Sequence, residues 1–315
     1  MIDIISHYLR EKFKVFFLTD NLIFHNTVIP VNQENFAPLV PTSEEKTIAF
    51  IDGGQAEILS GGNLCVSFIR VFAQVMKGTQ KVKSSTSEFY VVTTAVFRQG
   101  DIWYEGKIFP LQGQALVDEA HLIISSHDQT IRAGTERAPI SKISSLARRF
   151  AELALAKNID TDYILLDGTL EPTFKYEEMY LAELGNNVSA LAKTDSLFTT
   201  CGNNPTVLLQ KLSPHPHCWS YFIDGKSYIV KLHPSARHVF RFEGNSGVLP
   251  CLLAQSTDPL FLGYPYGLIV ADKMARISNA EKDALKMSFL LRDENRELAG
   301  YLNAMNAHDI LDRLG

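Results

Sequence analysis

The sequence predicts a mixed α/β fold, in which consecutive strands are followed by helix, strand, helix and strand, and the chain ends in helices. Apolar runs of strand length dominate residues 47–109, and helical spacing replaces them at about residue 141. Two of the apolar strands also end in Asp-Gly. This order fits neither a doubly wound parallel sheet nor a barrel, so we expect one mixed sheet with helices.

The composition is that of an ordinary globular protein. Of its 315 residues, 46% are hydrophobic and 21% charged, which excludes a disordered, collagen-like or coiled-coil chain. The net charge of −5 argues at first against a nucleic-acid partner, although a local basic patch can still bind one. The four cysteines form no C-x-x-C pair, so we expect reduced thiols. There is no membrane-length apolar run and no signal-peptide pattern, which predicts a cytoplasmic protein.

The first 45 residues are expected to form an N-terminal helical arm and a connector. Three prolines mark residues 26–46 as the connector. The apolar face of the helix must be covered, which makes the arm a candidate surface for a dimer or another partner. Residues 46–315 are expected to form one enlarged domain. The residues that recur at helical spacing within residues 1–25 are Ile4, Ile5, Tyr8, Leu9, Phe13, Phe16 and Phe17.

Residues 47–109 are predicted to form an antiparallel meander. A strand at residues 47–51 is stopped by Asp52-Gly53-Gly54, and a second strand covers residues 64–76. After a polar loop at residues 77–86, the strands at residues 89–97 and 102–109 form a hairpin.

From residue 141 onward, helices and strands are expected to alternate. The predicted helices lie at residues 144–157, 175–184 and 263–277, and the capping box Ser278-x-x-Glu281 opens a further one. The predicted strands lie at residues 163–166, where Asp167-Gly168 ends the run, at 189–193, and in a hairpin of residues 219–223 and 226–232 that is joined by 238–242.

Asp52 and Asp167 are the clearest candidates for chemistry, because each follows an apolar strand and precedes a glycine. Carboxylates at the ends of sheet strands lie where ligands bind in α/β folds, and the glycine allows backbone or metal to approach. Two such carboxylates repel each other and are best stabilised by a divalent cation. The alternative is that Asp-Gly only turns the chain. The sequence has no dinucleotide, P-loop, serine-hydrolase or zinc-site motif.

Four short segments occur in this order, scattered between about residues 47 and 280: FIDGGQAEILSGGNLCVSFIRV, YILLDGTL, SALAKTD and GYPYGLIVADKMARIS. Together they resemble the NurA nuclease family, which partners the HerA hexameric ATPase in DNA end processing. The resemblance implies an RNase H-like fold for residues 46–315. The family more usually has Asp-Gly-Ser at the first site, where this sequence has Gly54, a departure that removes a hydroxyl but leaves the carboxylate of Asp52.

The resemblance also implies a set of metal-binding acids. Asp52 and Asp167 match the family's metal-binding aspartates, and Asp272 is the late acid, in a predicted helix. The acid of the intervening helix matches Glu152, with Glu136 as the substitute.

Two of these acids have a plainer alternative. Glu152 lies about 200° around its helix from Phe150, the centre of the apolar face, which favours an exposed pair with Arg148. For Asp272, which is four residues before Arg276, the alternative to a metal is a solvent-facing pair with that arginine.

Seven side chains are candidates for contact with DNA. A lysine at a strand end suits a phosphate as a point charge, tyrosines suit a base, and basic residues that alternate with aromatic ones suit single-stranded nucleic acid. The alternatives are a snorkelling lysine, tyrosines packed in the core, and a hairpin that turns its charges to solvent. The seven are Lys193, Tyr264, Tyr266, Lys226, Lys231, Arg237 and Arg241.

The function that follows from the resemblance is metal-dependent hydrolysis of DNA. Asp52, Glu152, Asp167 and Asp272 would hold two Mn²⁺ or Mg²⁺ ions, with Lys193 beside them. The family implies a homodimer, 5′→3′ degradation and a HerA-like translocase as partner, in DNA repair and end resection or in antiviral defence. The alternatives are a catalytically inactive RNase H-like subunit that regulates an ATPase, or another polynucleotidyl hydrolase.

Overall fold

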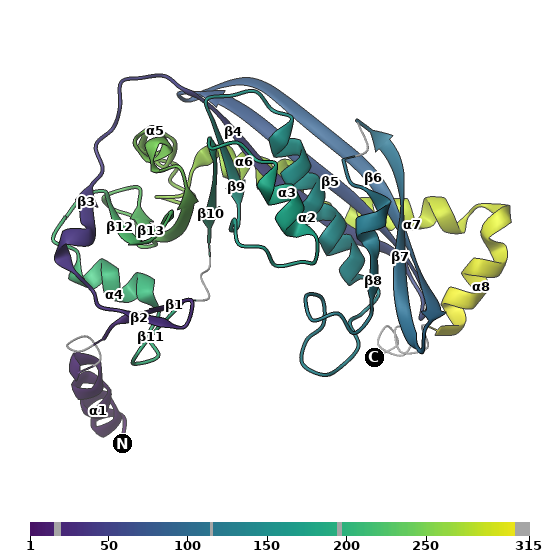
Figure 1. Cartoon of the computed structure of the whole chain (residues 1–315), viewed down its shortest axis with the longest axis horizontal. Coiled ribbons are helices and arrows are strands. Elements are labelled where there is room, and N and C mark those ends of the chain that lie inside the picture. The colour runs from purple at the N-terminus through teal and green to yellow at the C-terminus, as the bar shows by residue number, and fades with distance from the viewer. Residues whose placement is uncertain (16–19, 114–115, 194–196, 306–315) are drawn as a thin grey trace.

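A mixed sheet of eleven strands forms the centre of the protein in the computed structural model, which describes residues 1–15, 20–113, 116–193 and 197–305 (Figure 1). In the order in which they lie side by side, the strands are β3 (Phe36–Pro38), β12 (Trp219–Asp224), β13 (Ser227–Lys231), β14 (Phe240–Gly244), β10 (Val188–Ala192), β9 (Tyr163–Asp167), β4 (Thr47–Ser60), β5 (Leu64–Lys77), β6 (Gln80–Arg98), β7 (Asp101–Gln112) and β8 (Ile123–Ser125).

The strand order confirms the predicted fold class. Strands β4, β5, β6 and β7 form an antiparallel meander, β9 lies parallel to β4, and β10 lies parallel to β9. The meander therefore occupies one side of β4, and the later parallel strands occupy the other side. This is the RNase H-like arrangement, which β14 extends by pairing antiparallel to β10.

The meander strands are longer than the sequence pattern predicted. Strand β4 does not stop at Asp52 but continues through Gly53 and Gly54 to Ser60, because β5 maintains the hydrogen-bond ladder on that side. The polar stretch after residue 77 is also mostly strand. Only a tight turn with Gly78 at a φ of 55° separates β5 from β6, since Gln80 already pairs with Lys77.

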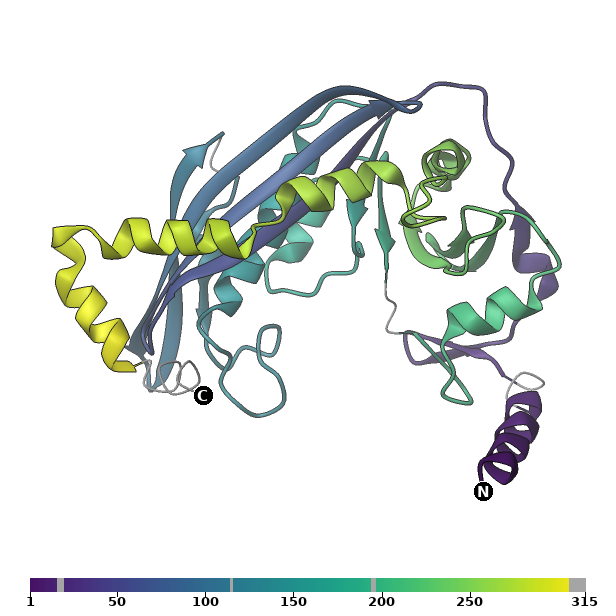
Figure 2. The ribbon, with the colours of Figure 1, turned by 180° about the vertical axis from the view of Figure 1, so that it is seen from behind.

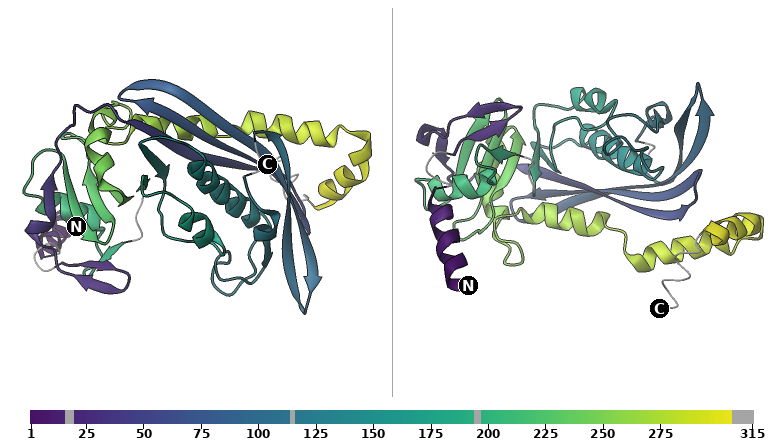
Figure 3. Two further views of the ribbon diagram at one scale, coloured as in Figure 1. Left: turned by 45° about the horizontal axis from the view of Figure 1, so that its top comes forward. Right: turned by 90° about the horizontal axis from the view of Figure 1, so that it is seen from below.

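Helices cover both faces of the sheet. The face in front in Figure 1 carries α2 (Lys142–Lys157) and α3 (Glu177–Ala182), and the opposite face carries α5 (Leu249–Gln255) and α6 (Tyr266–Ala275) (Figures 1 and 2). Seen from below, the sheet separates the two helical layers (Figure 3). Alternate residues of β4 serve the two cores, since Ile51 packs with Phe150 of α2 and Phe50 packs with Leu268 of α6.

The C-terminal helices extend along the meander. Helix α7 (Asn279–Leu290) begins at the predicted capping box, where the Ser278 hydroxyl accepts a hydrogen bond from the Glu281 backbone N–H. Helix α8 (Arg296–Met305) follows it (Figure 2). Short 3₁₀ helices lie at Gln33–Asn35, Glu119–Leu122, Ser246–Val248 and Asp293–Asn295.

The N-terminal segment contributes strands as well as a helix. Helix α1 (Ile2–Val15) exposes residues 1–12 to solvent, and the predicted apolar positions Phe16 and Phe17 lie outside the described residues. Strands β1 (Leu22–Phe24) and β2 (Thr27–Ile29) form a three-stranded sheet with β11 (Phe198–Thr199), and β3 joins the edge of the main sheet at β12. The expected connector is thus partly strand. Among the described residues, no helix combines the length and apolarity needed to cross a membrane.

Candidate metal centre

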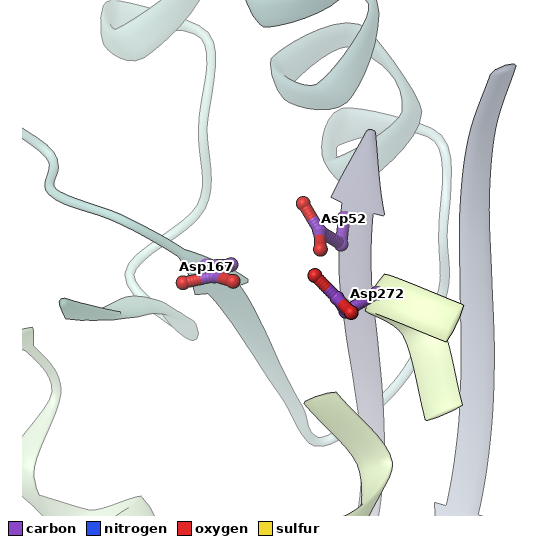
Figure 4. A group of neighbouring side chains, drawn as sticks. All are labelled: Asp52, Asp167 and Asp272. Atoms are coloured by element: carbon purple, nitrogen blue, oxygen red, sulfur yellow. The ribbon is translucent and has the colours of Figure 1, made fainter. Parts of the chain in front are cut away.

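Three of the predicted acids lie together at the sheet. One carboxylate oxygen from each of Asp52, Asp167 and Asp272 lies within 4.8 Å of the other two (Figure 4). The parallel register that pairs Ile51 with Leu166 brings Asp52 of β4 beside Asp167 of β9. Asp272 approaches from α6, on the face opposite to α2.

Glycines on β4 and α6 allow this close approach. A Cβ atom at Gly54 would lie 2.1 Å from the carbonyl oxygen of Ala275, and one at Gly267 would lie 2.1 Å from the ring of Phe50. Helix α6 therefore packs closely on β4, with backbone against backbone at Gly54 and with its own backbone against the Phe50 ring at Gly267, and Asp272 lies between these two contacts in the helix. The glycine that departs from the family's Asp-Gly-Ser pattern is the one that admits α6.

Of the three carboxylates, Asp52 is the one that makes no ion pair with a described residue. Asp52 is only 9% exposed. Burial, and then the charges of Asp167 and Glu152, raise the pKa of Asp52 to about 7, although the Gly53 backbone N–H donates a hydrogen bond to it and Lys193 lies near. Such a cluster favours a cation, and its oxygen ligands suit Mg²⁺ or Mn²⁺ better than zinc.

Lys193 is the nearest side-chain cation to the cluster among the described residues. Its Nζ lies 2.6 Å from Asp167 Oδ2 and 3.8 Å from Asp272 Oδ1. Burial opposes the charge on Lys193, but the hydrogen bond and charge of Asp167, with the charges of Asp272 and Asp52, outweigh it, so the pKa of Lys193 is raised. Asp272 also pairs with Arg276 at 2.7 Å, which is the alternative that the spacing predicted. The contacts with Arg276 and with Lys193 coexist.

Tyr264 lies beneath Lys193 in the core. Its ring is 1% exposed, and the Lys193 ammonium lies 5.1 Å from the ring centroid. The buried Tyr264 hydroxyl has no hydrogen-bond partner in normal geometry among the described residues. Burial and then Asp167 raise the pKa of Tyr264. The core-packing alternative therefore applies to Tyr264, whereas Tyr266 remains partly exposed beside Lys81.

Glu152 is buried, in contrast to the exposed pair that helical spacing favoured. It is 3% exposed, because the turn of α2 that bears it packs on Gly53, where a Cβ atom would lie 2.4 Å from Glu152 Oε1. It pairs with Arg148, as predicted, and lies 3.7 Å from Arg149. Burial is the main cause of its raised pKa. It lies behind Asp52 and outside the group of three aspartates, while the substitute, Glu136, is exposed in the loop before α2.

A polar network behind Asp52 was not predicted from the sequence. Arg148 donates hydrogen bonds to Glu152, to Gln55 Oε1 and to the Gly53 carbonyl oxygen, and Gln55 donates to Ser145 Oγ. The i,i+4 spacing of Arg148 and Glu152 signalled one part of it, but the contacts with β4 depend on how α2 docks.

The predicted DNA-binding residues do not form one surface. Arg241 is 2% exposed and pairs with Glu171 and Glu243. Its guanidinium is therefore buried in ion pairs and does not face solvent, where DNA would bind. Lys226 is exposed in the turn between β12 and β13, and Lys231 ends β13. Arg237 is exposed and lines the same pocket as Lys193.

Comparisons with known proteins give one family and a set of distant structures. Residues 46–200 match the family model of the NurA domain. No curated protein matches the chain. The chain is similar to the crystal structure of the NurA nuclease from Sulfolobus solfataricus, with 13% identity, coverage of 80% of this chain and 85% of that one, and a TM-score of 0.47. Another crystal structure of NurA has 11% identity to this chain, coverage of 84% of this chain and 92% of that one, and a TM-score of 0.48. The crystal structure of human ENDOV has 9% identity, coverage of 81% of this chain and 94% of that one, and a TM-score of 0.38.

Proposed function

We propose that this chain, in which residues 46–200 form a NurA domain, is a metal-dependent nuclease that hydrolyses DNA phosphodiester bonds. The observation that carries the proposal is the convergence of Asp52, Asp167 and Asp272, whose carboxylate oxygens lie within 4.8 Å of one another. The three come from β4, β9 and α6, so only the complete fold assembles them.

The three aspartates would hold a divalent cation, Mn²⁺ or Mg²⁺. Such a cation, when bound, lowers the pKa of a water molecule and stabilises negative charge on phosphate oxygens. With the cation bound, all three carboxylates would be ionised. Without the cation, ionisation of Asp52 is unfavourable, because its pKa is raised.

A second ion of a two-metal scheme would require Glu152. Its carboxylate is near enough to Asp167 for that charge to raise the pKa of Glu152, but Arg148 and Arg149 hold it. We therefore include Glu152 as a ligand that must turn away from Arg148. In its present position it helps to fix Gly53 and hence Asp52.

Lys193 would orient the substrate. Its ammonium lies at the cluster, and is about one-third exposed, so it can reach both the carboxylates and a phosphate. The ring of Tyr264 lies under Lys193 and limits where the ammonium can move.

The test is cleavage of linear DNA by the purified full chain in Mn²⁺. We expect Asp52→Asn and Asp167→Asn each to lose at least about a hundredfold in rate, since each removes a carboxylate from the site. Asp283→Asn removes the same charge from an exposed position on α7 and serves as the matched control. Equal cleavage by all variants, or none by the wild type, would refute the proposal.

A second candidate is a catalytically inactive subunit of the same fold that regulates an ATPase. The ion pairs of Glu152 with Arg148 and of Lys193 with Asp167 favour it, because both neutralise acids that a nuclease needs. Under this candidate the wild type binds DNA or its partner but does not cut.

The NurA domain also supports the wider proposal. We propose a cytoplasmic homodimer that processes DNA ends with a HerA-like hexameric ATPase, in DNA repair and end resection or in antiviral defence, with 5′→3′ polarity. Within it, residues 1–45 act as an arm and residues 46–315 as the nuclease domain. The exposed α1 is the candidate contact surface. Deletion of residues 1–15 should weaken self-association in sedimentation experiments if α1 mediates the dimer.

A further inference from the structure

A pocket of about 460 Å³ lies beside the acid cluster, and Lys193, which contacts the cluster, is one of its lining residues. Its walls come from α4 (Pro205–Leu212), the start of β14 and Phe261 in the segment before α6. Lys193 is part of the lining, and the same ammonium contacts Asp167. A molecule in the pocket is therefore adjacent to the proposed metal site.

The polar wall of the pocket suits an anion. Lys193, Arg237 and His238 line it, and none of the described residues in its lining is acidic. Thr206 and Gln210 of α4 add a hydroxyl and an amide. The exposed Arg237 has no ion pair with a described acid, in contrast to the buried Arg241. Side chains of this kind make most contacts with the phosphate groups of nucleic acids.

The lining of the pocket also contains aromatic rings. The rings of His238 and Phe261 lie edge to face with centroids 5.8 Å apart, and Phe261 stacks on Tyr264 at 5.1 Å. Tyr264 in turn supports Lys193. A continuous row of rings thus joins the pocket to the acid cluster. Aromatic side chains next to basic ones are the combination that binds a base together with its phosphate.

We propose that this pocket binds one nucleotide of the DNA strand, the one next to the phosphodiester at the acid cluster. The inference rests on the proposed function, and it specifies the path by which the DNA strand leaves the metal site. Arg237 holds a phosphate of that nucleotide, His238 and Phe261 contact its base, and Lys193 lies between the nucleotide and the phosphodiester at the acids.

Binding of single-stranded DNA tests the proposal without cleavage. The full chain carries Asp52→Asn, and fluorescence anisotropy follows a labelled oligonucleotide of about ten nucleotides. We expect Arg237→Ala to weaken binding about tenfold and to reduce the salt dependence by about one phosphate contact. His238→Ala should also weaken it. Arg292→Ala, an exposed arginine between α7 and α8, should change it less than twofold. Arg237→Ala binding as tightly as Arg292→Ala would overturn the proposal.

A mononucleotide separates the pocket from general attraction to the strand. Deoxyadenosine 5′-monophosphate should raise the melting temperature of the Asp52→Asn protein but not that of the Arg237→Ala double variant, while deoxyadenosine, which lacks the phosphate, should have a smaller effect. Equal shifts with both proteins would refute the pocket. These measurements involve no cleavage, so the two proposals can fail separately. The protein can bind the nucleotide in the pocket without cutting DNA, or cut DNA without binding the nucleotide there.

Discussion

Gly54 of β4 packs directly against the backbone of Ala275 in α6, so closely that a Cβ atom at position 54 would lie 2.1 Å from the Ala275 carbonyl oxygen. The contact involves backbone on both sides, so neither partner can yield by rotating a side chain. It lies one helical turn from Asp272 and two residues from Asp52. The packing of these two residues therefore controls how near Asp272 comes to the other aspartates.

Restoring the serine that the family pattern has at this position should damage this protein. We expect Gly54→Ser to push α6 away from β4 and to cost at least about 1–3 kcal/mol in the free energy of unfolding, the range for overpacked cores. The Mn²⁺ affinity should fall as well, because Asp272 moves with α6. Chemical denaturation and Mn²⁺ titration measure the two effects. Gly300→Ser is the control, since a Cβ atom there meets nothing within 4 Å. Unchanged stability and affinity in Gly54→Ser would contradict this account.

The raised pKa of Asp52 predicts a pH-dependent penalty in the metal-free protein. The folded pKa is about 7 against 3.8 for the unfolded residue, so folding favours the protonated form. The stability that protonated Asp52 contributes to the folded state is fully present below about pH 4 and is lost as the pH rises through 7. In EDTA, Asp52→Asn should therefore be more stable than the wild type at pH 8, by up to about 4 kcal/mol, and the difference should shrink toward pH 4.

Metal addition should reverse that order. With excess Mn²⁺ at pH 8, the wild type should gain stability because the ion binds only the folded state, while Asp52→Asn should gain little. Melting curves with EDTA and with Mn²⁺ decide this, and Asp283→Asn should behave as the wild type does. A melting temperature of the wild type that does not change when Mn²⁺ is added would rule out a metal site.

Lys193 is expected to compete with the metal while assisting the reaction. Its ammonium contacts Asp167 and Asp272, so Lys193→Met should strengthen Mn²⁺ binding several-fold by removing a positive charge. Under the proposed function the cleavage rate should nevertheless fall, because the cation proposed to orient the phosphate is gone. Lys193→Arg should recover part of the rate. If Lys193→Met weakens Mn²⁺ binding instead, the lysine supports the site structurally.

The order of elements along the chain and the candidate aspartates Asp52 and Asp167 were predictable from the sequence, because both depend on local patterns, although β4 continues past Asp52 instead of ending there. Apolar runs identify β4, β5 and β9, and parallel neighbours necessarily bring Asp52 and Asp167 to the same place. The glycines after Asp52 were more ambiguous. They resemble a turn, but their function is to admit a helix on each face of a continuing strand.

The burial of charged residues was not predictable, because it depends on tertiary docking. Helical periodicity places Glu152 away from the apolar face, yet α2 turns that side toward Gly53. Arg241 belongs to an alternating strand pattern typical of exposed charges, yet Glu171 and Glu243 surround it. Glu171 is far from Arg241 in the sequence, so only Glu243, which lies at i+2 on the same strand face, could have indicated this ion pair.

Glu152 can be tested as a ligand separately from its structural role. If it binds a second ion, Glu152→Gln should weaken Mn²⁺ binding or halve its stoichiometry, and Arg148→Met should strengthen binding by freeing the carboxylate. If Glu152 only supports Gly53, Glu152→Gln should leave the stoichiometry unchanged. Isothermal titration with Mn²⁺ distinguishes the two outcomes, and melting temperatures of both variants report any loss of folding.

Arg70 is predicted to hold the C-terminal helices against the meander. Its guanidinium donates hydrogen bonds to Glu88 of β6 and to Glu281 in the first turn of α7, and all three side chains are mostly buried. Arg70→Met leaves two carboxylates facing each other, and because none of the three side chains is fully buried, we expect the loss of these charged hydrogen bonds to cost about 1.5–3 kcal/mol.

The exposed pair of Arg296 and Asp293 provides the matched control. Its side chains are 86% and 97% exposed and 3.8 Å apart, so Arg296→Met should change the free energy of unfolding by less than about 1 kcal/mol. If α7 is fixed mainly by its apolar face instead, Arg70→Met and Arg296→Met will unfold at similar urea concentrations. A large difference between their midpoints would support the role of Arg70. If adding Glu281→Gln to Arg70→Met reduces that difference, repulsion between Glu88 and Glu281 is the cause, because the second change removes one of the two charges.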